Sequence, residues 1–142
     1  MLRLLFTLTA VITALAATAQ TTLKQEVLLP VNMGAMAKSS VPVAPLAEVR
    51  RALGQPAAVL LDVRTPAEFA AGHLPGAQNL DFRAPDFAQQ VARLTPQTPY
   101  ILYCASGNRS SQAAIIMQEK GFRKVVNAGA FKDLNAAGVR KQ

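Results

Sequence analysis

Two short runs of strongly apolar residues constrain the fold of this chain more than any other feature. Residues 57–63 read AAVLLDV and residues 100–103 read YILY. Neither run alternates between apolar and polar positions, as a strand with one face in water does. Continuous apolar runs of this length are typical of strands buried on both faces, and such strands occur in parallel sheets covered by helices. The two runs therefore predict an α/β domain.

The segments around these runs carry the signals of helices and further strands. Residues 46–53 place apolar side chains on one helical face between Pro45 and Gly54, and residues 65–68 (TPAE) form a capping box with proline at the first helical position. The other expected elements are a strand over 77–80, a helix after Pro85, a helix over 110–120, a strand over 125–126 and a turn with a brief helix over 129–134. This alternation predicts a mainly parallel sheet with helices on both faces, and functional loops at the carboxyl ends of its strands.

Composition and charge narrow the classes of partner. The chain has 142 residues, 51% of them apolar, which is enough for one domain with a proper core. A formal net charge of +7 favours anionic partners. Lysine and arginine are scattered without a basic tract and aromatic residues are few, so no nucleic acid is expected as a partner.

The N-terminal residues have the pattern of a signal peptide. Arg3 gives a positive start, residues 4–16 are largely apolar, and residues 17–19 (ATA) have the small-x-small form of a cleavage site. A membrane anchor is the alternative, but the apolar run is shorter than the roughly 20 residues that a spanning helix needs. We expect residues 1–19 to be removed, leaving no stable membrane anchor, and the protein to be periplasmic or otherwise exported. Residues 20–42 have no clear period and are interpreted as a linker or N-terminal extension, before a domain over 43–142.

Cys104 is the only cysteine of the chain. In an exported protein a single thiol indicates an intermolecular disulfide or a reactive sulfur, although a buried cysteine can also serve as a small apolar residue. Its position favours reactivity, because it follows the strand at 100–103 and precedes a helix. Backbone N–H groups and the positive end of that helix would stabilise a thiolate, and Gly107 would allow the tight loop between them.

Arg109 ends the loop with a fixed positive charge and a planar fork of donors, which suits bidentate binding of an oxyanion. We expect the substrate to be held by the loop residues Ala105, Ser106, Gly107, Asn108, Arg109 and Ser110. Cysteine phosphatases place five residues between their cysteine and arginine, whereas four lie between Cys104 and Arg109. A shorter loop surrounds a smaller group, so the spacing favours a single extra sulfur atom over a phosphate.

Three segments together resemble the hallmark segments of rhodanese-like domains in order and spacing. They are residues 61–69 (LDVRTPAEF), 72–77 (GHLPGA) and 104–110 (CASGNRS). The resemblance implies a five-stranded parallel sheet flanked by helices. It also implies that Cys104 takes sulfane sulfur from thiosulfate or a similar donor, as a persulfide, and passes it to an acceptor such as cyanide or a thiol. No cofactor and no metal are implied.

Several residues of these segments have structural interpretations. Asp62 and Arg64 are expected to form a pair that braces the active loop, Glu68 is accounted for by the capping box, and His73 is expected to bond to backbone in a turn. The family often has a second glycine where this chain has Ala130, whose methyl group could narrow the pocket.

Two functional hypotheses remain at this point. In the first, the protein is a monomeric sulfurtransferase whose partners are a small anionic donor and a thiol or cyanide acceptor. In the second, the same fold serves as a slow sulfur carrier or a protein-binding module. The sequence contains the complete loop with its cysteine, which favours the enzyme.

Overall fold

The computed structural model describes residues 40–141, which contain a sheet of four parallel strands in the order β2-β1-β3-β4. The strands are β1 (Val59–Asp62), β2 (Ala77–Asn79), β3 (Tyr100–Cys104) and β4 (Val125–Ala130). The predicted α/β class with a parallel sheet is confirmed. The fifth strand implied by the resemblance is not among the described residues, and the predicted signal peptide at 1–19 also lies outside them.

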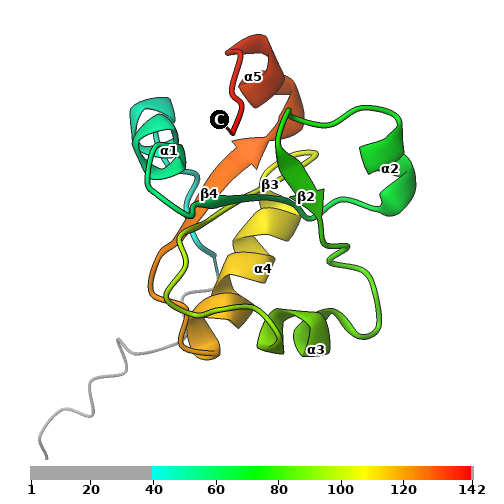
Figure 1. The fold of residues 1–142 in the computed structure, drawn as a ribbon. Coiled ribbons are helices and arrows are strands. Elements are labelled where there is room, and N and C mark those ends of the chain that lie inside the picture. Colours follow the sequence, from blue (N-terminus) through cyan, green and yellow to red (C-terminus); the bar gives the residue numbers. More distant parts are fainter. Residues whose placement is uncertain (1–39, 142) are drawn as a thin grey trace, which may run out of the picture. The chain divides into compact units, whose positions relative to one another are not determined.

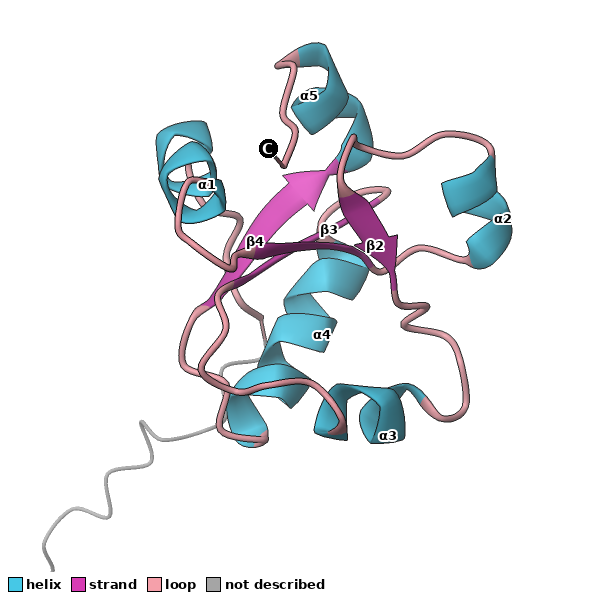
Figure 2. Cartoon of the chain, viewed as in Figure 1, coloured by secondary structure: helices cyan, strands magenta, loops and turns pink. Residues whose placement is uncertain are grey.

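Helices cover both faces of this sheet, as predicted (Figures 1 and 2). The helices are α1 (Leu46–Leu53), α2 (Pro66–Ala70), α3 (Phe87–Ala92), α4 (Asn108–Glu119) and α5 (Phe131–Ala136). In Figure 1, α1 and α5 lie on one face, α3 and α4 lie on the other, and α2 lies beyond the β2 edge. No helix in the described range is long and apolar enough to cross a membrane.

The central strand β3 shows how the sheet separates two cores. All five of its residues are buried. Because successive side chains of a strand point to opposite faces, Leu102 and Cys104 join the core formed with α3 and α4. Ile101 and Tyr103 join the core formed with α1 and α5. Cys104 therefore emerges on the α4 side of the sheet, at the carboxyl end of a strand that is fixed on both faces.

The predicted helix over 46–53 and the predicted capping box are confirmed. The Thr65 hydroxyl accepts a hydrogen bond from the Glu68 amide at 3.3 Å, and the Thr65 amide donates to Glu68 Oε2 at 3.1 Å. These reciprocal bonds satisfy amide groups that a helix start would otherwise leave without partners. They fix where α2 begins, and they hold the Glu68 carboxylate in one place.

Several predicted boundaries differ from the structure, and two of the differences lie at the site. The helix after the cysteine begins at Asn108, two residues before the predicted start, because Gly107 takes a positive φ of 91° and turns the chain directly into α4. The last strand continues to Ala130, so the turn predicted to begin at Gly129 was wrong. A shift in the pairing between β3 and β4 lets the strand pass Gly129, which also has a φ of 91°.

Candidate active site

The nucleophile and the positive end of a helix meet in one short loop. Cys104 ends β3, α4 begins at Asn108, and residues 105–107 connect the two. Cys104 itself is fully buried. The N-terminus of α4 carries partial positive charge, which stabilises negative charge placed beside it. The loop thus brings the sulfur into a setting that favours an anion.

Hydrogen bonds lower the pKa of the Cys104 thiol. The Gly107 amide donates to Sγ at 3.1 Å, and the Ser110 hydroxyl lies 3.6 Å from Sγ. Burial by itself raises the pKa of the thiol, but hydrogen bonds from Ser110, Ser106 and Gly107 outweigh it, and the pKa is lowered from its ordinary value. A thiol with a lowered pKa is present more often as the nucleophilic thiolate at neutral pH.

Asn127 connects this loop to β4, and no sequence motif pointed to its role. Its side chain is buried, and its Oδ1 accepts hydrogen bonds from the Ser110 hydroxyl at 2.7 Å and from the Gly129 amide at 3.1 Å. Its Nδ2 donates to the Val41 carbonyl at 2.8 Å. Asn127 lies inside β4, so its polar side chain is buried within a strand, and the short strand predicted over 125–126 hid this position.

Two glycines leave room for one side of Val43, which precedes α1 and is otherwise exposed. A Cβ on Gly129 would lie 2.7 Å from Val43 Cγ1, and a Cβ on Gly107 would lie 3.2 Å from Val43 Cγ2. Both glycines also have a positive φ, which other residues rarely adopt. The active loop, the end of β4 and the segment before α1 are therefore packed together.

Arg109 pairs with a carboxylate. Its Nη1 and Nη2 each donate to one oxygen of Glu68 at 2.8 Å, in a bidentate ion pair that is partly buried. The hydrogen bond from Arg109, assisted by those from Thr65, lowers the pKa of Glu68 from 4.5 to about 2. The hydrogen bond to Glu68 in turn raises the pKa of Arg109. The capping box, which accounts for Glu68 from the sequence alone, includes its bonds to Thr65 but not its ion pair with Arg109.

Asp62 and Arg64 form the predicted pair, but its contacts reach Gly72 and Phe131 and do not reach the active loop that the pair was expected to brace. The Arg64 guanidinium donates to both carboxylate oxygens of Asp62, at 2.6 Å in the shortest contact, and also to the Gly72 carbonyl at 2.7 Å. Its Cζ lies 4.2 Å from the centre of the Phe131 ring. His73 lies in the turn as predicted, where its Nδ1 is 3.0 Å from the Phe69 carbonyl.

The other predicted site residues differ in how closely they approach the sulfur. Ala105, Ser106 and Asn108 are exposed. Of these three, only Ser106 contributes to the lowered pKa of the thiol, through a hydrogen bond from its backbone. Asn108 uses its side-chain oxygen to accept from Gln112 on α4. Ala130 pairs with Cys104 across the sheet and lines a separate hollow of about 190 Å³ between α1 and α5.

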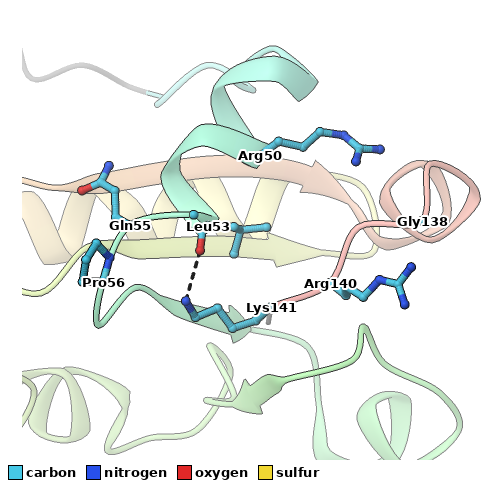
Figure 3. A pocket seen from close by; sticks show the side chains of 8 residues that line it. Arg50, Leu53, Gln55, Pro56, Gly138, Arg140 and Lys141 are labelled. Atoms are coloured by element: carbon cyan, nitrogen blue, oxygen red, sulfur yellow. Dashed lines mark hydrogen bonds between the residues drawn. The ribbon is translucent and has the colours of Figure 1, made fainter.

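Two larger hollows lie at different places and have different lining residues. One of about 560 Å³ lies against the loop and is lined by Ser106, Gly107, Asn108 and residues 40–43, among others. The second, of about 500 Å³, lies where α1 meets the C-terminal segment (Figure 3). There Lys141 donates to the Leu53 carbonyl at 3.1 Å and Arg50 to the Ala137 carbonyl at 2.6 Å. These two hydrogen bonds hold α1 and the C-terminal segment together, and Cys104 lines neither of the two hollows.

No group of three or more histidine, cysteine, aspartate or glutamate side chains that could hold a metal ion occurs in the described range. The site consists of a thiol with a lowered pKa, a loop of hydrogen-bond donors and a paired arginine. Such an arrangement can attack an electrophilic sulfur and can hold the product on the attacking atom.

Comparison with known proteins places this site in a family. Residues 45–137 match the family model described as "Rhodanese-like domain". Thiosulfate sulfurtransferase PspE of Escherichia coli strain K12 is 33% identical over 82 residues, which cover 56% of this chain and 77% of that protein. Thiosulfate sulfurtransferase GlpE of Pseudomonas fluorescens is 38% identical over 86 residues, which cover 60% of this chain and 77% of that protein.

Comparison with a solved structure also points to a sulfurtransferase. The human single-domain sulfurtransferase TSTD1 is similar to this fold with a TM-score of 0.55 and 26% identity, over 68% of this chain and 96% of that one. The family match covers well over half of the chain and includes β1 to β4 together with the Cys104 loop. The chain therefore belongs to the rhodanese-like domain family, as a sulfurtransferase.

Proposed function

We propose that the protein transfers the outer sulfur of thiosulfate, or of a similar small anionic donor, to a thiol or cyanide acceptor through a persulfide on Cys104. The observation that carries this proposal is the hydrogen bonding of the sulfur. The amide of Gly107 donates to Sγ at 3.1 Å, and backbone hydrogen bonds from Ser110, Ser106 and Gly107 lower the pKa of the thiol. The names of the PspE and GlpE relatives support thiosulfate as the donor.

In the first half-reaction the Cys104 thiolate attacks the outer sulfur of thiosulfate. A sulfur–sulfur bond forms on the protein, the sulfur–sulfur bond of thiosulfate breaks, and its electron pair leaves with sulfite. Arg109 and the loop amides stabilise the departing oxyanion. The protein then carries one extra sulfur atom within the loop of residues 105–110.

In the second half-reaction the acceptor removes that sulfur. Cyanide carbon, or the sulfur of an acceptor thiolate, attacks the outer persulfide sulfur and forms a bond to it. The bond between the two sulfurs breaks, and its electron pair returns to Cys104 as thiolate. Because the two substrates react in turn with one nucleophile, ping-pong kinetics are expected.

The test is turnover with thiosulfate and cyanide, measured as thiocyanate and sulfite formed. The wild-type protein should turn over and should gain the mass of one sulfur atom on Cys104 when the donor is given alone. Cys104→Ser should do neither while keeping its circular dichroism spectrum, because a hydroxyl cannot hold a persulfide. A stable sulfur adduct without turnover would instead favour a sulfur carrier, and activity of Cys104→Ser near the wild-type rate would refute the mechanism.

In this proposal the protein is exported and acts as a monomer. The small-x-small site at 17–19 after an apolar segment supports export. The mature protein isolated from its native cells should begin near Gln20, and peptides that contain Arg3 would argue against cleavage. Sedimentation of the mature protein should give the mass of one chain.

A further inference from the structure

Arg109 meets Glu68 with the same edge of its guanidinium that would bind the oxyanion of a donor. Nη1 and Nη2 each donate to one carboxylate oxygen of Glu68 at 2.8 Å. This end-on bidentate geometry is the one that arginine uses for carboxylates, sulfates and phosphates. An anionic donor that binds Arg109 in this way takes the place of the Glu68 carboxylate, or it binds another edge beside a negative charge.

The Glu68 carboxylate is also held in place from its own helix. Oε2 accepts hydrogen bonds from the Thr65 amide at 3.1 Å and from the Thr65 hydroxyl at 3.0 Å, and α2 begins at this box. The side chain of Glu68 is 34% exposed and that of Arg109 is 16% exposed. The carboxylate is therefore a fixed charge that solvent ions can reach.

We infer that Glu68 is a specificity-determining residue, which competes with anionic groups for Arg109 and thereby disfavours donors of high negative charge. The inference rests on the proposed function and refines it. Repulsion between two like charges grows with the charge of the donor. A dianion such as thiosulfate meets this carboxylate at a greater cost than a monoanion with the same sulfur–sulfur bond.

Methanethiosulfonate provides the matched monoanion. Attack of Cys104 on its outer sulfur forms the same persulfide and breaks the same kind of bond, and the electron pair leaves with methanesulfinate in place of sulfite. The two donors differ in carrying a methyl group or a third, charged oxygen. The ratio of their KM values therefore reports how the site responds to donor charge.

The experiment measures KM for both donors, with cyanide as acceptor, in the wild type and in Glu68→Gln. Glutamine keeps the size of the side chain and an oxygen acceptor, and it removes the charge. KM for thiosulfate should fall about fivefold, and KM for methanethiosulfonate should change less than about twofold. The difference between donors should shrink at high salt, because salt screens partly exposed charges.

Two control variants separate charge at this site from other effects. Glu119→Gln removes the same charge from the far end of α4, where the glutamate is exposed, and should leave both KM values unchanged. Glu68→Asp keeps the charge on a shorter side chain, so its KM for thiosulfate should be closer to that of the wild type than the KM of Glu68→Gln is. Equal changes for both donors, or a rise in KM for thiosulfate, would overturn the inference.

Binding measured without turnover distinguishes failure of this inference from failure of the proposed function. Calorimetric titration of Cys104→Ser with thiosulfate, with and without Glu68→Gln, reports anion affinity alone. Tighter binding in the double variant supports the inference even if the wild type proves unable to transfer sulfur from thiosulfate. Equal binding in the two proteins overturns it, whatever the activity.

Discussion

The part of the chain that the structure describes contains two ion pairs, each between an arginine and a carboxylate. Asp62 and Arg64 lie two residues apart, and their side chains are 0% and 7% exposed. Glu68 and Arg109 lie 41 residues apart and are 34% and 16% exposed. The pairs have the same chemistry, and they differ in how far solvent and substrate can reach them.

Burial determines what each pair can do. Arg64 is enclosed by Asp62, by the carbonyl of Gly72 and by the Phe131 ring, so an anion from solvent cannot replace Asp62 as its partner. This pair fixes the turn after β1. Arg109 keeps contact with solvent, and an incoming anion can compete for it. A charged pair at the surface of a site is therefore available for recognition, whereas the same pair in the core serves the fold.

The largest expected effect comes from breaking the buried pair. Asp62→Ala leaves the Arg64 charge buried without compensation, and such losses cost about 3–5 kcal/mol. Glu68→Ala should cost only about 1 kcal/mol, since its pair is partly solvated. Urea unfolding of both variants measures the two free energies. Similar losses for the two variants would show that burial does not distinguish the pairs.

Arg109→Lys tests the partly exposed pair through its function. Lysine keeps the charge and loses the bidentate fork, so we expect a loss of about 1.5–3 kcal/mol in donor binding. This corresponds to a rise in KM for thiosulfate of roughly 10- to 150-fold. Discharge of persulfurated Cys104 to cyanide, followed in a single turnover, should change less. If KM stays constant while discharge slows, Arg109 instead supports the loop around the persulfide.

Thr65→Ala separates the helix-capping part of Glu68 from its ion pair. The variant loses the hydroxyl that accepts from the Glu68 amide and donates to Oε2. We expect a cost of about 1 kcal/mol in unfolding free energy, as for other N-cap substitutions. Thr65→Ser keeps a hydroxyl at this position and should recover most of that loss. No recovery would indicate that the methyl group of Thr65, and not its hydroxyl, stabilises α2.

The smallest expected effect is a pH dependence of stability at the partly exposed pair. The folded pKa of Glu68 is about 2, below its ordinary value of 4.5. A group whose pKa is lowered on folding stabilises the protein above its unfolded pKa and loses that contribution as pH falls through its folded pKa. The stability of the wild type relative to Glu68→Gln should therefore be constant above pH 4.5 and decline toward pH 2. A difference that does not vary with pH would contradict the lowered pKa.

Sequence patterns predicted local features of this protein well. The helix over 46–53, the capping box at Thr65 and the placement of Cys104 at the end of a buried strand all follow from spacing and side-chain type. Each depends on residues within a few positions of one another. Helix caps and apolar runs are patterns of this short range, so they can be recognised in the sequence.

Features that depend on distant residues were not predictable in the same way. Glu68 and Arg109 carry no shared local signal, so the pair required the fold. Strand β4 was predicted over 125–126 alone because Asn127 and Gly129 are poor strand formers. The pairing shift beside β3 and the side-chain bonds of Asn127 keep the strand intact there.

The segment before α1 has a practical consequence for how this enzyme can be shortened. Similarity to the family begins at residue 45, yet Val41 and Val43 contact the active loop and the end of β4 from outside that boundary. A protein cut back to the region of homology would keep the strands and Cys104, but Asn127 would lose its bond to Val41, and Val43 would no longer cover Gly107 and Gly129. Recognisable similarity thus ends inside the set of residues that pack against the active loop, and a trimmed domain would report the reactivity of an altered site.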